Sequence, residues 1–139
     1  MLDRFGREIN YLRISVTDRC NLRCKYCISD ENPSLLQYND FLSIDEIAQI
    51  TRTAVEMGVT KVRLTGGEPL VRDGIVELVS ILAEIPGIDD FAMSTNGILL
   101  GEFAKPLVKA GLHRVNISLD TVEPERFFEL TGGGELSKV

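Results

Sequence analysis

The sequence predicts an α/β fold built on a curved, parallel β-sheet. Segments typical of strands alternate with segments typical of helices, and parallel strands need such crossover helices. Each predicted strand has a two-residue period, with one apolar row and one largely polar row. The strands expected from this pattern are Leu12 to Thr17, Val59 to Thr65, Phe91 to Thr95 and Arg114 to Leu119.

Helix signals lie between and after these strands. Ser43, with Glu46 three residues later, forms a capping box that predicts a helix ending near Gly58. The crossover helices expected after the later strands are Asp73 to Ile85, Leu100 to Ala110 and Pro124 to Leu130. Pro106 fits poorly inside a helix, so we expect the middle one to be kinked or to start late.

Two segments without regular periodicity complete the chain. The polar stretch from Asp30 to Phe41 predicts a loop that could cover a site. Three consecutive glycines, Gly132 to Gly134, predict a flexible break.

The polar rows of the strands predict a binding surface. If helices cover the apolar rows, the polar rows share the opposite face, and parallel sheets rarely leave a face bare. We therefore expect the concave side of the sheet to hold a polar ligand, the alternative being a solvated surface. Arg13, Lys61 and Arg63 would bring three positive charges there, which suits a phosphate or carboxylate.

All the cysteines of the chain lie in one C-x-x-x-C-x-x-C cluster, at Cys20, Cys24 and Cys27. Thiolates hold iron–sulfur clusters, and three of them leave one iron of a 4Fe–4S cubane open to bind a small molecule. The alternatives are a zinc site with a fourth ligand, or a disulfide with one free thiol.

Composition excludes several classes of partner. The chain has 139 residues, 44% of them hydrophobic, as expected for one globular domain. It starts without an apolar secretory segment and predicts no membrane span, so we expect a reducing cytoplasm. The net charge of −6 argues against nucleic acid and anionic lipid as partners.

Two motifs together resemble the radical S-adenosylmethionine superfamily. They are Asp18 to Cys27 and, after the second strand, Thr65 to Leu70. Within the superfamily the chain is similar to the GTP 3′,8-cyclases of molybdenum cofactor biosynthesis. The segments that carry this similarity are Leu12 to Arg19, Lys61 to Leu64, Ser94 to Gly97 and Arg114 to Asp120.

The resemblance implies a partial parallel (β/α) barrel of about four βα units, with a 4Fe–4S cluster and S-adenosyl-L-methionine as cofactors. It implies cluster ligation by Cys20, Cys24 and Cys27, and S-adenosylmethionine contacts from Tyr26, Gly67 and Ser118. It places Arg13, Arg63 and Ser94 at GTP, and Lys61 is added because it lies two residues before Arg63. Glu68 and Pro69 are expected to shape their turn, and Asp120 to hold the sheet end.

The implied reaction is the first step of molybdopterin biosynthesis. A 5′-deoxyadenosyl radical abstracts the 3′ hydrogen of GTP, and the ribose radical attacks C8 of guanine to give (8S)-3′,8-cyclo-7,8-dihydroguanosine 5′-triphosphate. An electron donor must reduce the cluster. No side chain acts as an acid or base in the first step, because the cofactor carries the chemistry.

The family also has a C-terminal region with a second cluster, but no cysteine follows Cys27 here. Residues 1–139 are therefore expected to be the N-terminal part of the barrel domain, inactive alone and prone to form homodimers through an open strand edge. Two alternatives remain: a radical enzyme acting on a peptide or another small molecule, and a non-catalytic metal-binding module.

Overall fold

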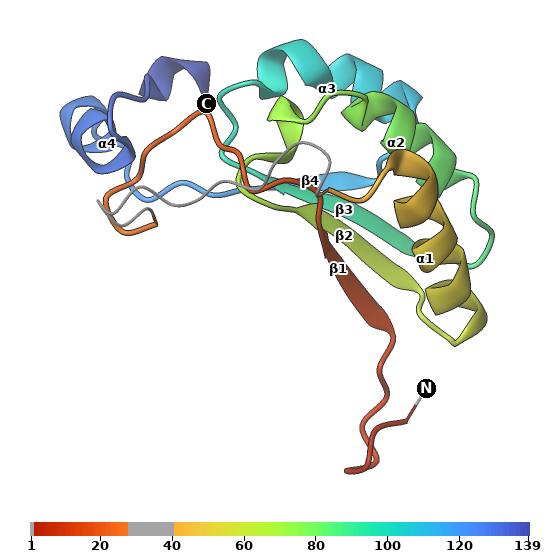
Figure 1. Cartoon of the computed structure of the whole chain (residues 1–139). Coiled ribbons are helices and arrows are strands. Elements are labelled where there is room, and N and C mark those ends of the chain that lie inside the picture. The colour runs from red at the N-terminus through yellow and green to blue at the C-terminus, as the bar shows by residue number, and fades with distance from the viewer. Residues whose placement is uncertain (1, 28–40) are drawn as a thin grey trace.

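The computed structural model describes residues 2–27 and 41–139, and contains one four-stranded parallel sheet. Its strands are β1 (Tyr11–Ser15), β2 (Lys61–Thr65), β3 (Asp90–Thr95) and β4 (Arg114–Ile117). They lie in sequence order, and each neighbouring pair is parallel (Figure 1). The predicted strands are thus confirmed, and no strand end is displaced by more than two residues. Sequential parallel pairing is the arrangement of a (β/α) barrel that has not closed.

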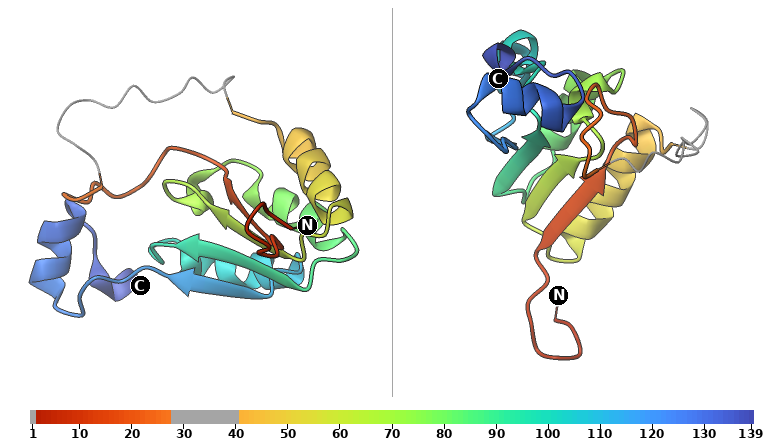
Figure 2. Two further views of the ribbon diagram at one scale, coloured as in Figure 1. Left: turned by 90° about the horizontal axis from the view of Figure 1, so that it is seen from below. Right: turned by 90° about the vertical axis from the view of Figure 1, so that its left-hand side faces the viewer.

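Three helices cover one face of this sheet. They are α1 (Ile44–Glu56), α2 (Ile75–Ala83) and α3 (Leu100–Lys109), and Figure 1 shows all three on the same side. The predicted capping box is present at α1, where Glu46 N donates to Ser43 Oγ at 3.2 Å and Ser43 N donates to Glu46 Oε2 at 2.7 Å. The opposite face of the sheet carries no helix among the described residues (Figure 2).

Pro106 lies inside α3, which begins at Leu100. The expectation of a late start was therefore wrong. The proline lacks an N–H, but its carbonyl still accepts from Ala110 N at 2.9 Å, and the next residue, Leu107, is buried against the core. Burial of this side chain offsets the missing backbone hydrogen bond.

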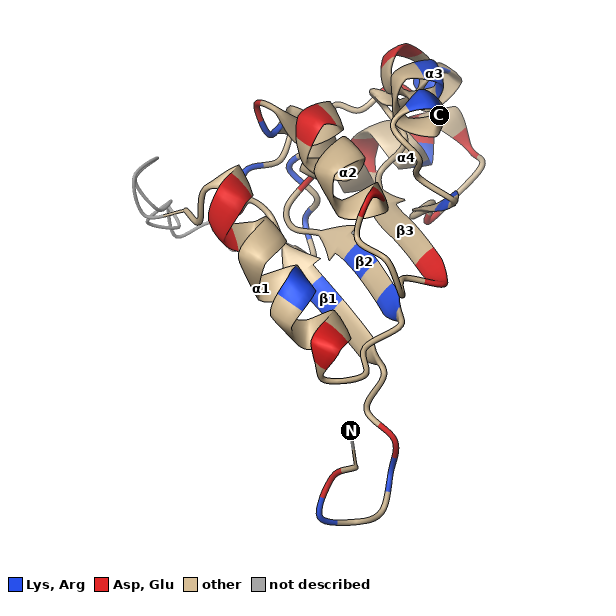
Figure 3. Ribbon diagram, turned by 90° about the vertical axis from the view of Figure 1, so that its right-hand side faces the viewer, with Lys and Arg blue, Asp and Glu red and all other residues tan. Residues whose placement is uncertain are grey.

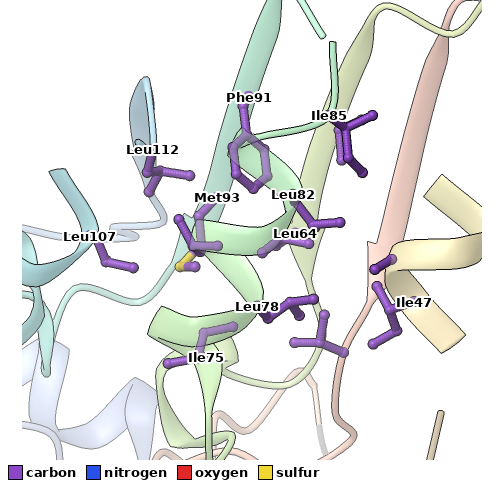
Figure 4. Close-up of a cluster of buried hydrophobic side chains, with 14 of the residues drawn as sticks. Ile47, Leu64, Ile75, Leu78, Leu82, Ile85, Phe91, Met93, Leu107 and Leu112 are labelled. Atoms are coloured by element: carbon purple, nitrogen blue, oxygen red, sulfur yellow. The ribbon is translucent and has the colours of Figure 1, made fainter. Parts of the chain in front are cut away.

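The hydrophobic core lies between the sheet and these helices (Figure 4). Leu64 of β2 and Met93 of β3 are fully buried, as are Leu78 and Leu82 of α2. These strand residues belong to the apolar rows, so the two-residue period correctly separated the core face from the open face.

The last helix, α4 (Pro124–Thr131), does not join the other three. Figure 1 shows it apart from them, beside the segment that carries the cysteines. Backbone hydrogen bonds from Arg23 N to Thr131 O (2.9 Å) and from Lys25 N to Leu130 O (3.0 Å) attach it there. Its expected role as a crossover helix over the sheet is therefore not seen in the described residues, because its partner is the cysteine segment.

The three glycines after α4 form a packed helix terminus, so the predicted flexible break was wrong. Gly132 has a left-handed φ of 68°, and Gly133 N donates to Phe128 O at 2.9 Å. A Cβ at Gly134 would meet Thr131 Oγ1 at 2.5 Å and Leu22 Cδ2 at 3.0 Å. Absence of a side chain here permits close packing against the cysteine segment.

Glu68 joins the carboxyl ends of β2 and β3. It begins the short 3₁₀ helix η2 (Pro69–Val71) and is 1% exposed. Its carboxylate accepts from Leu70 N at 3.0 Å, Thr95 Oγ1 at 2.8 Å and Asn96 N at 2.7 Å. These three donors satisfy a buried charged group that would otherwise be costly, so the expected role of Glu68 in shaping the turn is confirmed.

A second 3₁₀ helix, η3 (Leu136–Lys138), follows α4 and lies beside it. Within the described ranges, no helix has the length and apolar character needed to cross a bilayer. The predicted covering loop, Asp30 to Phe41, lies outside the described residues except for Phe41.

The Glu68 carboxylate generates a stability prediction. Glu68→Gln should lower the free energy of unfolding by about 1–3 kcal/mol, because the amide NH₂ cannot accept from the donors that now share the two oxygens. Urea denaturation measures the change. The matched control is Glu77→Gln on the exposed side of α2, which should leave the midpoint unchanged. Equal midpoints for the two variants would contradict the bridging role.

The free edge of β4 generates a second prediction. In the described residues β4 pairs only with β3, and its Ile117 side chain is 43% exposed. Such edges favour pairing with another chain. Ile117→Lys should therefore reduce the dimeric and aggregated fraction seen by light scattering. Val108→Lys, on the exposed surface of α3, serves as the control and should have no such effect.

Candidate functional site

The cysteine segment, residues 16–27, directly follows β1. Its first residues are hydrogen-bonded to the end of β2 and to the turn after β2. Val16 N donates to Thr65 O at 2.8 Å, Gly67 N to Thr17 O at 2.8 Å, and Glu68 N to Arg19 O at 2.8 Å. The turn after β2 is thereby held against the residues that precede Cys20. The segment and this turn lie together at the carboxyl edge of the sheet, where α/β proteins place their ligands.

Gly67 is required at this contact by the space available. A Cβ there would lie 2.2 Å from the Arg19 carbonyl oxygen and 2.8 Å from that of Asp18. These are backbone atoms, so the neighbouring chain could not simply turn a side chain aside. The sequence predicted that Gly67 admits a cofactor group, and the structure supplies a second reason for glycine, the close approach of two protein backbones.

The three cysteines lie on this one segment as free thiols. Cys20 and Cys24 are half-buried and Cys27 is exposed. In the part of the chain that the structure describes, no three Cys, His, Asp or Glu side chains converge on a single-ion site. The chemistry of the donor set, three thiols within one short segment, fits a 4Fe–4S cluster, whose irons are held by Cys sulfur.

Electrostatics links the thiols to one another. Burial raises the pKa of the Cys24 thiol, a hydrogen bond with Tyr26 opposes that rise, and the charges of Cys20 and Cys27 add to it. The sulfurs of Cys20 and Cys27 therefore lie near enough for their charges to act on the Cys24 thiol. Bound iron would favour the thiolate form of Cys24, because a metal-bound thiol is deprotonated.

Tyr26 connects the cysteine segment to the end of β4. Its hydroxyl donates to Asp120 Oδ2 at 2.5 Å, and this bond, the largest cause, raises the pKa of the Tyr26 phenol. Tyr26 as a whole is 66% exposed. The contact attaches Asp120, three residues after β4, to the cysteine segment, and gives Tyr26 a structural partner that the sequence did not reveal. The expected role of Asp120 at the sheet end stays a prediction.

Asn96 also contacts the cysteine segment, and sequence analysis assigned it no role. Its Nδ2 donates to Asn21 Oδ1 at 2.8 Å and lies 3.8 Å from Cys20 Sγ, while Leu22 N lies 3.4 Å from the same sulfur. Hydrogen bonds to cluster sulfurs tune reduction potentials. The signal available in the sequence was the position of Asn96 directly after β3, at the same edge as the cysteines.

The open face of the sheet brings the predicted cations together. Arg13 of β1 pairs in register with Arg63 of β2, and Lys61 lies two residues earlier on the same face. Figure 3 shows these basic positions on β1 and β2. Arg63 Cζ lies 5.6 Å from the ring centroid of Tyr11, and its buried Nε meets no acceptor among the described residues. A buried donor of this kind is costly unless a ligand accepts its hydrogen bond.

The two predicted serines lie nearer the carboxyl edge. Ser94, on β3, pairs in register with Asn116 of β4. Ser118 follows β4, and its backbone N donates to Thr95 O at 2.9 Å, which places it at the same level as the cysteine segment. The structure thus separates the predicted residues into a cationic region on the sheet and a second group near the cysteines.

The Radical SAM superfamily model matches residues 14–138 of the chain. Among curated proteins, a GTP 3′,8-cyclase of Pelotomaculum thermopropionicum is 56% identical over 137 residues, covering 99% of this chain and 42% of the relative. One from Peptoclostridium acidaminophilum is 52% identical over 139 residues, covering the whole chain and 43% of the relative. The chain therefore spans less than half the length of these relatives.

Solved structures of Streptococcus suis SuiB have the same fold. SuiB bound to the precursor peptide SuiA matches with a TM-score of 0.71 and 25% identity, covering 89% of this chain and 27% of that one. SuiB bound to S-adenosylmethionine matches with a TM-score of 0.69 and 24% identity, covering 93% of this chain and 27% of that one. These matches confirm the predicted α/β architecture with an incomplete barrel.

The family match extends over most of the chain and includes the end of β1, the cysteine segment, the glycine turn after β2 and the other three strands. Its donor set, three free thiols on one segment, fits the expected cluster, because Cys sulfur holds the irons of such clusters. The chain belongs to the radical SAM superfamily, whose cofactors are a 4Fe–4S cluster and S-adenosylmethionine.

Proposed function

We propose that residues 1–139 are the N-terminal part of a GTP 3′,8-cyclase barrel, and that they hold the cluster, S-adenosylmethionine and the triphosphate of GTP. The observation that carries this proposal is the paired arginines Arg13 and Arg63 on the open face, below the cysteine segment. Relatives with that printed activity, 52% and 56% identical to this chain, support the choice of substrate.

In the proposed site, Cys20, Cys24 and Cys27 ligate the cluster and leave one iron for S-adenosylmethionine. Gly67, Tyr26 and Ser118 contact that cofactor, because they lie on the turn, the segment and the strand end that surround the cysteines. When bound, the two cofactors supply one-electron cleavage of a carbon–sulfur bond and thus a group able to abstract hydrogen from the substrate. An external electron donor completes the system.

The cations of the open face orient the substrate. Arg13 and Arg63 present planar donor groups that match phosphate oxygens, and Lys61 adds a third charge. Ser94 offers a hydroxyl one row closer to the cysteines. A triphosphate held by the cations would direct the nucleoside towards the carboxyl edge, where hydrogen abstraction takes place. This positioning is the main contribution that the side chains make to the rate.

The charge of this face also favours a nucleotide over a peptide. SuiB is described with a bound precursor peptide, so the fold itself admits either substrate class. Three cations on adjacent strands and the unpaired Arg63 Nε favour a polyanion. A peptide substrate would need other contacts to offset that charge.

The cluster assignment predicts iron content. Anaerobic reconstitution of the chain should give a brown, oxygen-sensitive protein with about four irons. Replacing Cys20, Cys24 or Cys27 singly by Ala should abolish iron retention, since two thiolates cannot hold the cubane. Lys25→Ala, on the same segment, is the control and should retain iron. Iron bound at the parent level in all three cysteine variants would reject the assignment.

The substrate assignment predicts a loss of GTP binding. It can be measured in a chimaera in which this chain replaces the matching segment of the Pelotomaculum thermopropionicum relative. Arg63→Ala should weaken GTP binding by roughly 1.5–3 kcal/mol, the value of a charge-assisted contact. Cleavage of S-adenosylmethionine without GTP should change little.

The matched control is Arg52→Ala, an exposed arginine on α1, away from the open face. It removes the same charge but should leave GTP affinity unchanged. Equal loss of GTP binding and of cofactor cleavage in Arg63→Ala would point to misfolding and contradict a substrate role.

A further inference from the structure

Three polar side chains form a connected network on the open face of β3 and β4. Arg114 donates to both oxygens of Asp90, through Nε at 2.9 Å and Nη2 at 2.7 Å. Its Nη1 donates to Asn116 Oδ1 at 2.6 Å. Asp90 and Arg114 are 30% and 43% exposed, so the network faces the open side and not the core. None of these residues has a role in the site described above.

The network determines which way the Asn116 amide points. A guanidinium group has only donors, so the amide must present its oxygen to Arg114. The amide nitrogen, with its two N–H donors, is then directed away from Arg114. No acceptor within residues 2–27 and 41–139 is bonded to it. Asn116 is exposed on the open face, so its amide is oriented as a donor that a ligand could reach.

Asp90 accepts two of the three hydrogen bonds in the network and determines its net charge. Two bonds from Arg114 lower the pKa of the Asp90 carboxyl, and the charges of Lys61 and Arg63 lower it further. Asp90 therefore stays ionised and neutralises Arg114. The net positive charge of the open face therefore comes from β1 and β2. The group that β4 presents to a ligand is the uncharged amide of Asn116.

The register places Asn116 between the cations and the cofactor region. One row across the four strands consists of the register partners Arg13, Arg63, Ala92 and Arg114. In the next row of the same face, Asn116 pairs with Ser94. Ser118 follows two residues later. Successive rows on one face are about 6–7 Å apart, given the rise of a β-strand. A nucleotide with its phosphates over the arginine row would bring its ribose above Ser94 and Asn116.

We propose that Asn116 donates a hydrogen bond to an uncharged acceptor on the ribose of the bound nucleotide, and that Arg114 and Asp90 are positioning residues for that donor. The proposal rests on the GTP-binding function proposed above. It makes Asn116 a substrate contact that orients the sugar between the triphosphate and the cysteine segment.

The test measures GTP affinity by equilibrium dialysis in the chimaera. Asn116→Leu is nearly isosteric and uncharged, and should raise the Kd for GTP about ten-fold through loss of the donor. Asn116→Asp keeps an acceptor for Arg114 while removing both donors, so it should also bind GTP more weakly even if the leucine variant folds poorly. Asn10→Leu, just before β1, is the control and should bind as the parent does.

The positioning role is tested by two changes of equal charge at Arg114. Arg114→Gln can still donate to Asn116 Oδ1, whereas Arg114→Leu cannot. Arg114→Gln should therefore bind GTP more tightly than Arg114→Leu. The difference cannot come from the lost positive charge, because both variants lack it. Cleavage of S-adenosylmethionine without GTP should be the same in both variants.

Parent-like GTP affinity in both Asn116 variants, or equal affinities for the two Arg114 variants, would overturn the proposal. A parent chimaera that binds no GTP would instead reject the proposed function on which it rests.

Discussion

The close backbone contact between the segment before the cysteines and the turn after β2 is the constraint on which the rest of the site depends. Gly66 and Gly67 lie so near Thr17 and Arg19 that a Cβ on either would fall within 2.5 Å of a carbonyl oxygen. Hydrogen bonds from Gly67 N and Glu68 N to those carbonyls complete the contact. Main-chain geometry therefore positions the cysteines at the carboxyl edge of the sheet.

Around this contact, different elements hold the cysteine segment at separate points. α4 binds it through the backbone of Arg23 and Lys25, Asp120 through Tyr26, and Asn96 through Asn21. Glu68 joins the turn after β2 to β3. These polar contacts attach the cysteine segment to the end of β3, to the residues after β4 and to α4.

The two faces of the sheet have different environments: one packs against the helices, and the other is open to a ligand. Residues such as Leu64 and Met93 are fully buried under the helices, while their neighbours Arg63 and Ser94 face the open side. The overall charge is −6, yet the cations of β1 and β2 make this face locally positive. Asp90 limits that positive region by neutralising Arg114. Local charge, and not the net charge, is what an anionic ligand would meet.

The sequence alone was sufficient for the local features of the fold, and it predicts a common chemistry for the cysteines. The capping box of α1 and the two faces of each strand depend on residues close in sequence, and were predicted correctly. Cys20, Cys24 and Cys27 lie within one short segment, so their common chemistry could also be inferred. Arg13 and Arg63 were expected to share a face, because alternation fixes the side of a strand to which each residue points.

Only the tertiary structure decided the contacts between residues far apart in the chain. Glu68 bonds Thr95, Tyr26 bonds Asp120, and Arg114 bonds Asp90, and none of these pairs has a local signal. The glycines after α4 suggested flexibility by composition, yet Gly134 packs against Leu22. Local sequence specifies backbone preference and periodicity, whereas the partner of a polar group or a glycine depends on which strands become neighbours. That choice is made by the packing of the whole sheet and its helices.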